Sequence, residues 1–132
     1  MKFVFKIEPY PKRTATFGMR GRFPRVIKNK KTTEFETNLR QMCANQYKSA
    51  ALTGPLAVKV AFYLTKPKSV KREYPTVTPD TDNLLKSCFD AMNGLLWEDD
   101  CQIVNIEAAK RYSTGDGFIV MEVYSLTLQP TV

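Results

Sequence analysis

Residues 79–103, PDTDNLLKSCFDAMNGLLWEDDCQI, decide the expected fold of this chain. Apolar side chains recur at helical spacing from Leu84 to Met92 and predict a helix over residues 81–93 that ends at Gly94. Acidic residues gather in two groups, one at the start of this helix and one a few residues after its end. The helix therefore presents an apolar face for packing and carries carboxylates near both of its ends.

Outside this stretch, alternating apolar residues predict strands, and helical spacing predicts one further helix. The predicted elements are a strand at 2–8, a helix from Thr32 or Thr33 to about Ser49, a strand at 56–64, the helix at 81–93, and strands at about 101–111 and 117–128. A glycine-containing turn at 113–117 indicates that the last two strands form a hairpin. Residues 9–31 hold three prolines, two glycines and eight basic residues, so an exposed basic loop is expected there, and residues 65–80 form a second irregular basic stretch.

The element order β-α-β-α-β-β predicts an α+β fold, with one mixed or antiparallel sheet and two helices on one of its faces. The 132 residues fit a single domain over residues 1–132. No apolar run approaches the roughly 20 residues that span a bilayer, and the charged N-terminus does not resemble a signal peptide. A cytoplasmic protein without a membrane partner is therefore expected. Cys43, Cys88 and Cys101 are expected to be reduced thiols, with Cys88 and Cys101 in or near the core.

Charge divides the chain into a basic and an acidic part. Residues 1–79 carry 17 Lys and Arg against 4 Asp and Glu, a net charge of +13, whereas residues 80–132 carry 3 against 9, a net charge of −6. Basic surface attracts a phosphate backbone, and clustered carboxylates hold the divalent ions that help to cleave it. The chain has no histidine, so a metal site must use oxygen ligands, which favours Mg²⁺ or Mn²⁺. This pattern indicates a metal-dependent enzyme that acts on nucleic acid.

Three carboxylates are expected to converge on one or two Mg²⁺ ions. Asp80 and Asp82 lie at the start of the predicted helix, and Asp100 follows a short turn that is expected to lead back toward that start. Lys86, one turn into the helix, is expected to contact a phosphate or the leaving oxygen. Asp90 lies one turn further along the same face, where it is expected to face Lys86.

Simpler interpretations of the same residues stay open. Asp80 or Asp82 taken alone is more often a helix cap, and Asp82 with Lys86 is also an ordinary i,i+4 ion pair. The pair at residues 99–100 also fits a solvated turn. Calcium binding of the EF-hand type is excluded, because leucines stand where that loop needs polar ligands and glycine.

The same stretch also resembles a known family signature. Residues 79–86 (PDTDNLLK), 89–94 (FDAMNG) and 97–103 (WEDDCQI) resemble the motif of the RusA family of Holliday junction resolvases. That motif is roughly P-D-x-D-N-L-x-K, then D-x-L-N-G, then W-x-D-D-x-Q-I, and this chain departs from it with Met92 in place of Leu. The basic segment of residues 9–22 is similar, less specifically, to the N-terminal loop of the family.

The resemblance implies a small endodeoxyribonuclease, of a kind often encoded by phages or prophages. It implies Asp80, Asp82 and Asp100 as the Mg²⁺ ligands and Lys86 as a catalytic cation. It also implies a homodimer that nicks two opposing strands of a four-way DNA junction symmetrically and leaves 5′-phosphate and 3′-hydroxyl ends. Water activated by the metal would attack the phosphodiester in line, so neither a histidine nor an organic cofactor is required.

DNA contacts are expected from the motif and from the basic segment before it. The expected DNA-binding residues are Lys12, Arg13, Arg20, Arg22, Asn83 and Lys86. Phe17 or Phe23 is expected either to insert at the junction or to pack its loop on the domain. Two alternative functions remain, namely a nuclease for other branched DNA and a non-catalytic basic DNA-binding dimer whose acidic cluster is structural.

Overall fold

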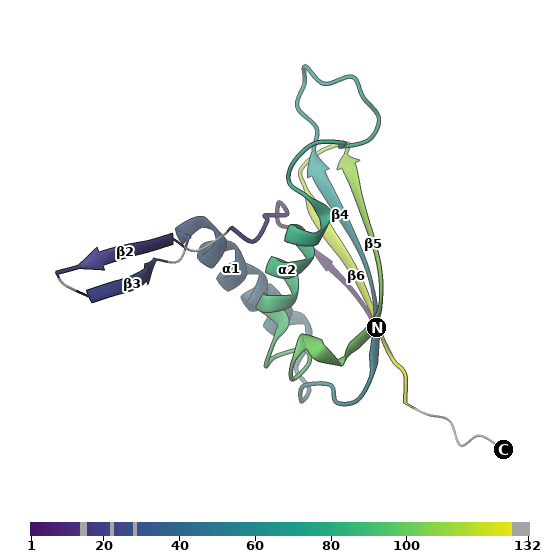
Figure 1. The fold of residues 1–132 in the computed structure, drawn as a ribbon. Helices are drawn as coiled ribbons and strands as arrows, with labels where there is room; N and C mark the ends of the chain where they lie inside the picture. The colour runs from purple at the N-terminus through teal and green to yellow at the C-terminus, as the bar shows by residue number, and fades with distance from the viewer. Residues whose placement is uncertain (14–15, 22, 28, 128–132) are drawn as a thin grey trace.

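The computed structural model describes residues 1–13, 16–21, 23–27 and 29–127, and it has the predicted α+β architecture. The elements in chain order are β1 (Lys2–Phe5), β2 (Thr16–Arg20), β3 (Phe23–Ile27), α1 (Lys30–Gln46), β4 (Leu56–Thr65), α2 (Thr81–Met92), the 3₁₀ turn η1 (Asp100–Gln102), β5 (Ile103–Ser113) and β6 (Phe118–Ser125). Apart from the β2–β3 pair, this order confirms the predicted β-α-β-α-β-β succession. Figure 1 shows α1 and α2 together on one side of the sheet.

The strand β4 lies inside a four-stranded mixed sheet with the order β1-β6-β4-β5. It pairs antiparallel with β6 and parallel with β5, so the predicted hairpin between the last two strands is wrong. The turn after β5 instead carries the chain past the end of β4, and β5 and β6 lie on either side of that strand. Because β4 lies in the interior of the domain, its backbone N–H and C=O groups need partners along both edges, and β5 and β6 supply them.

The hydrophobic core fills the space between the sheet and the two helices. Every second residue of β4, from Leu56 to Leu64, is buried against the helices. From α2, Leu84 and Met92 enter the same core, and Trp97 from the turn after the helix is fully buried there. The apolar face that the sequence predicted for α2 therefore fixes the helix on the sheet, and its acidic face remains outside.

The cysteines are free thiols in two different environments. Cys43 and Cys88 are buried in the core, and burial raises the pKa of Cys43 to about 11. Cys101 is exposed, so the prediction that it lies in or near the core is wrong. The physical reason is that Cys101 belongs to η1, a short turn without buried residues that precedes β5.

The helix α1 begins earlier than predicted. Asn29 is its N-cap, and the side-chain oxygen accepts a hydrogen bond from the backbone N–H of Thr32 at 3.1 Å. The start predicted at Thr32 or Thr33 is therefore two to three residues too late, whereas the bounds predicted for α2 are confirmed within a residue. No helix in the described ranges has the length and apolar character needed to cross a membrane.

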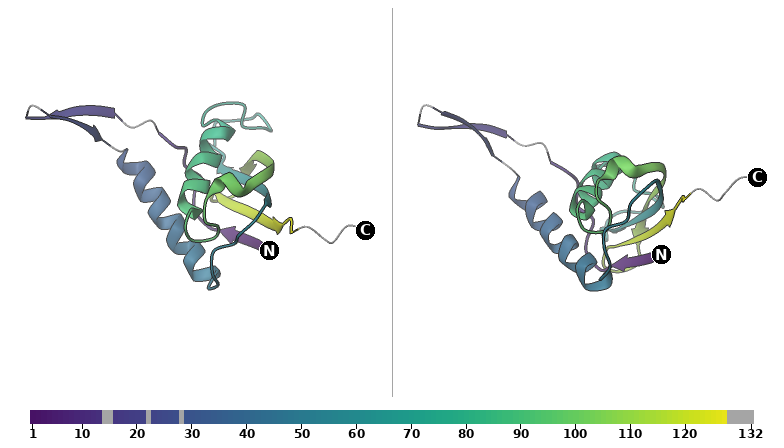
Figure 2. Two further views of the ribbon diagram at one scale, coloured as in Figure 1. Left: turned by 60° about the horizontal axis from the view of Figure 1, so that its bottom comes forward. Right: turned by 90° about the horizontal axis from the view of Figure 1, so that it is seen from below.

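Residues 16–27 contain an antiparallel β-hairpin, β2 with β3, where the sequence predicted an irregular loop. Gly21 in its turn has φ 63°, a conformation that glycine adopts without steric cost. Figures 1 and 2 show the hairpin projecting away from the sheet beyond the start of α1. Gly18 and Pro24 interrupt the strand pattern in the sequence, which is why local periodicity did not reveal it.

Candidate functional site

Asp80 and Asp82 lie at the N-terminal end of α2, as the sequence predicted. Asp80 is the N-cap residue, Asp82 lies in the first turn, and both side chains are exposed. The Asp80 side chain makes no capping hydrogen bond, so its carboxylate does not serve the helix as a cap. The unpaired N–H groups and the dipole of the helix favour negative charge at this end. Two accessible carboxylates thus stand within one turn of each other at a helix start.

Contacts from two other parts of the chain hold this helix start in place. Lys110 on β5 donates from Nζ to the carbonyl oxygens of Val77 and Pro79, at 2.7 and 2.9 Å. The backbone N–H of Lys12 donates to the carbonyl oxygen of Asn83 at 2.8 Å. Sequence reasoning missed Lys110. Its sequence offers one signal for such a role, a lysine within an otherwise strand-like run. The sheet register then places this lysine opposite a buried residue of β4.

Lys86 faces Asp90 one turn along α2, as predicted, with Nζ 3.9 Å from Oδ2. Asp90 has a closer partner in Lys12, whose Nζ lies 3.0 Å from Asp90 and 2.7 Å from Glu36 on α1. Burial acts to lower the pKa of Lys12, but the hydrogen bonds to Glu36 and Asp90 outweigh it and raise that pKa. Lys12 is therefore a charged link between α1 and α2. Lys86, with 63% of its side chain exposed, is the more accessible cation.

Asp100 lies near the opposite end of α2. Asn93, the C-cap residue of the helix, donates from Nδ2 to Asp100 Oδ2 at 3.4 Å. The Asn93 side chain also accepts a hydrogen bond from Nε1 of the buried Trp97 at 2.7 Å. These contacts tie Asp100 to the C-terminal end of the helix.

One chain does not bring Asp100 to Asp80 and Asp82. An α-helix rises 1.5 Å per residue, so the helix ends at Asp80 and Asn93 lie about 20 Å apart. Oxygens that share one Mg²⁺ at about 2.0–2.1 Å lie within about 4 Å of each other. Among the residues that the structure describes, no group of three or more Cys, Asp or Glu side chains is placed to hold a metal ion. The prediction that Asp100 lies near the start of α2 is therefore wrong for a single chain. The chain after Asp100 runs along α2 as β5 and reaches the helix start only at Lys110.

Arg13 and Asn83 lie on the surface beside the helix start. The Arg13 guanidinium carbon is 5.7 Å from the centroid of the Tyr10 ring, and the backbone N–H of Arg13 donates to Thr32 Oγ1 at 3.2 Å. The Asn83 side chain is exposed. Four other residues predicted to contact DNA lie wholly or partly outside the described residues: Arg22 entirely, and Phe17, Arg20 and Phe23 in their side chains. Their DNA contacts, like that of Lys12, stay predictions.

Comparison with known proteins agrees with the signature at residues 79–103. The sequence pattern of the family described as Endodeoxyribonuclease RusA matches residues 6–123, which is most of the chain. A Bacillus subtilis (strain 168) protein, "Uncharacterized protein YqaN", is 36% identical to this chain over 54% of the chain and 60% of its own length. The alignment thus spans less than two thirds of that relative, whereas the family pattern spans β4, α2, η1 and β5 in full. The chain belongs to the RusA endodeoxyribonuclease family.

Proposed function

We propose that this protein is a divalent-metal-dependent endodeoxyribonuclease that resolves four-way DNA junctions by paired, symmetric nicking. Membership of the family supports cleavage of DNA. The observation that carries the proposal is the start of α2. There the Asp80 carboxylate makes no capping hydrogen bond, and the exposed Asp82 carboxylate lies within the same turn. A donor set of carboxylate oxygens in a chain without histidine fits Mg²⁺ or Mn²⁺.

The residues around the helix start have separate tasks in this proposal. Asp80 and Asp82 would hold the ion, which offsets phosphate charge and makes water a stronger nucleophile at neutral pH. Lys86 lies one turn further along α2, and its ammonium group would bind a phosphate oxygen. The ion pair with Asp90 would orient the Lys86 side chain. The two basic stretches at residues 9–31 and 65–80 would hold the DNA against an acidic region that otherwise repels it.

We infer that Asp100 of the partner subunit completes this site in a homodimer. β5 is an edge strand of the four-stranded sheet, and Val104 and Ile106 near its start are 66% and 47% exposed. An unpaired edge with exposed apolar side chains favours pairing with another strand. Antiparallel pairing of two β5 edges about a two-fold axis sets the start of one strand beside the end of the other.

This pairing matches the positions of the carboxylates. The start of β5 follows closely on Asp100, and the end of β5 adjoins the helix start through Lys110 and Pro79. Asp100 of the partner subunit would therefore approach Asp80 and Asp82, which the Asp100 of the same chain does not reach. Two such sites related by a two-fold axis suit two opposing strands of a four-way junction.

The test is cleavage of a synthetic four-way junction beside a 5′-flap and a linear duplex, with Mg²⁺ or with a chelator. Wild type should nick the junction at symmetric positions only with the metal, and Asp82→Asn should abolish nicking but keep junction binding. Asp116→Asn, a change in the exposed turn before β6, is the control and should cut normally.

Each other outcome points to a different function. Preferred cutting of the flap identifies a nuclease for other branched DNA. Binding without Mg²⁺-dependent nicking, or equal cutting by Asp82→Asn, contradicts the enzyme proposal and favours the non-catalytic DNA-binding dimer.

A further inference from the structure

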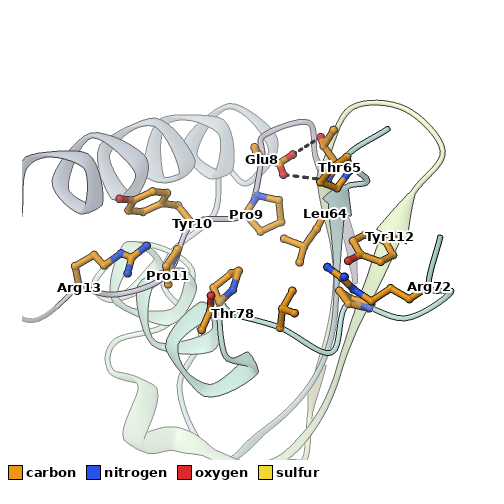
Figure 3. A pocket seen from close by; sticks show the side chains of 14 residues that line it. Glu8, Pro9, Tyr10, Pro11, Arg13, Leu64, Thr65, Arg72, Thr78 and Tyr112 are labelled. Atoms are coloured by element: carbon orange, nitrogen blue, oxygen red, sulfur yellow. Dashed lines mark hydrogen bonds between the residues drawn. The ribbon is translucent and has the colours of Figure 1, made fainter. Parts of the chain in front are cut away.

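A pocket opens beside the start of α2, next to the candidate metal site. It lies between the segment of residues 8–13, the ends of β4 and β5, and the loop of residues 67–79, and Figure 3 shows the side chains that line it. Its volume is about 270 Å³, just below the roughly 300 Å³ at which pockets for small molecules begin. A space of this size suits a single planar ring system.

Rigid apolar groups form much of the pocket wall. Five prolines line it, among them Pro75 and Pro79, together with the side chains of Leu64 and Val77. Proline has a fixed φ and no backbone N–H, so such a wall keeps its shape and offers few donors of its own. The wall therefore fits the flat apolar faces of an aromatic ring.

Tyr112 supplies a polar group that is otherwise unused. Figure 3 shows this β5 side chain directed toward the pocket, and its hydroxyl oxygen is buried without a hydrogen-bond partner among the described residues. A buried hydroxyl that lacks a partner is unfavourable, and the phenol both donates and accepts. A ligand with a hydrogen-bonding edge therefore gains affinity at this position.

Positive charge surrounds the same pocket. The guanidinium carbon of Arg72 lies 5.8 Å from the centroid of the Tyr112 ring, and that of Arg13 lies 5.7 Å from the Tyr10 ring. The acidic side chain in the wall, Glu8, accepts hydrogen bonds on both of its oxygens from the last residue of β4, at 3.0 and 2.8 Å. The two guanidinium groups are thus placed to bind phosphates beside a ring in the pocket.

We propose that this pocket binds one unstacked nucleobase of the DNA substrate. The Tyr112 hydroxyl bonds an edge of the base, and Arg13 and Arg72 bind the phosphates that flank it. This inference rests on the proposed function and extends it, because Pro79 lines the pocket and Asp80 follows directly. The captured base then neighbours the phosphate at the metal site.

Base capture explains how the site can discriminate between DNA forms. A base at a branch point leaves the stack at a lower energetic cost than a base inside a continuous duplex. A pocket that must be filled before the adjacent phosphate is positioned therefore favours cutting at branched DNA.

Fluorescence of 2-aminopurine tests the pocket without any cleavage. The analogue is placed singly at positions around the centre of a four-way junction, and protein is added without divalent metal. We expect a several-fold rise in fluorescence at one position in each strand to be cut, because the analogue brightens when it leaves the stack. A bound junction that shows no rise at any position overturns the proposal.

Two variants attribute the signal to the pocket. Tyr112→Phe removes only the hydroxyl and should weaken binding of that junction about fivefold, with a smaller fluorescence rise. Tyr124→Phe is the matched control, because its hydroxyl bonds Glu122 on an exposed surface, and it should behave like wild type. Arg72→Gln should also reduce the rise. If Tyr112→Phe and Arg72→Gln both match wild type, the pocket does not hold the base.

The two proposals fail in distinguishable ways. A protein that raises the fluorescence but never nicks with Mg²⁺ contradicts the nuclease proposal and leaves the pocket supported. A protein that nicks junctions without any fluorescence change contradicts the base pocket alone.

Discussion

Lys110 Nζ lies 2.9 Å from the carbonyl oxygen of Pro79, the residue before Asp80. This contact joins the distal half of β5 to the start of α2, across 31 positions of sequence. A hydrogen bond from an ammonium group is stronger than one between neutral groups, and partial burial keeps solvent from weakening it. The sheet, through Lys110, therefore determines where the first carboxylate stands.

Lys110→Met should impair cleavage more than it impairs folding. The change removes two charge-assisted hydrogen bonds, whose acceptors regain water, so we expect a loss of about 1–2 kcal/mol in the free energy of unfolding. The rate of junction cleavage should fall by more than the loss of folded protein accounts for, because the segment that carries Asp80 is no longer held in place. Urea unfolding and single-turnover cleavage measure the two effects. Lys59→Met, which removes an exposed 3.7 Å ion pair with Glu107, is the control and should cut normally.

Mixing two inactive variants should restore nicking. In the proposed dimer, Asp82→Asn and Asp100→Asn are each inactive alone, because every site lacks one ligand. A mixed dimer holds one site with both changes and one site with neither, so nicking of a single strand should return. The assay mixes the variants under conditions of subunit exchange and follows the nicked and resolved products. A mixture that stays as inactive as its components contradicts a site shared between subunits.

The dimer surface itself can be tested by charge. Ile106→Lys places a charge on the exposed apolar start of the β5 edge and should shift the sedimentation mass toward the monomer, with loss of Mg²⁺-dependent nicking. Val4→Lys makes the same kind of change on β1, the strand at the other edge of the sheet, where Val4 is 43% exposed. It should leave the dimer and its activity intact. A dimer that survives Ile106→Lys contradicts the β5 interface.

Gly117→Ala should destabilise the protein, whereas Gly115→Ala should not. A Cβ at Gly117 would lie 2.8 Å from the backbone oxygen of Tyr63 and would collide with the Glu8 carboxylate, which bonds Thr65. Such overpacking lowers the free energy of unfolding by about 1–3 kcal/mol. Gly115 lies in the same turn, and a Cβ added there would meet no atom within 4 Å, so Gly115→Ala is the matched control. Chemical denaturation of the three proteins measures the difference.

Lys12→Met should show a pH-dependent loss of stability. The pKa of Lys12 is raised above its ordinary value of 10.5, so its contribution is fully present below about pH 10.5 and disappears as pH rises through the higher folded-state pKa. We expect a loss of at most about 1 kcal/mol at neutral pH, because the pair with Glu36 and Asp90 is partly solvated. Urea unfolding at several pH values should show the difference from wild type closing in strong alkali. A constant difference at every pH contradicts a role for the charge.

Much of the fold could be predicted because its signals are local. The alternation of β4 and the spacing of the apolar residues in α2 lie within single elements, and each is found where the periodicity placed it. The start of α1 was predicted too late because two threonines, a residue type that also favours N-cap positions, follow the true cap Asn29 within four residues. The β2–β3 hairpin was missed because Gly18 and Pro24 interrupt the strand pattern in its sequence.

Residue types and short spacings in the sequence were sufficient to identify the carboxylates at the start of α2, the pairing of Lys86 with Asp90, and the family. Only the tertiary structure determined that β5 lies parallel to β4, and that Asp100 contacts Asn93 at the far end of the helix. It also determined that Lys110 holds the segment before Asp80. The reason is physical: helix spacing and caps depend on neighbours a few residues away, whereas strand order depends on which edges satisfy the backbone of a buried strand, and that choice involves the whole chain.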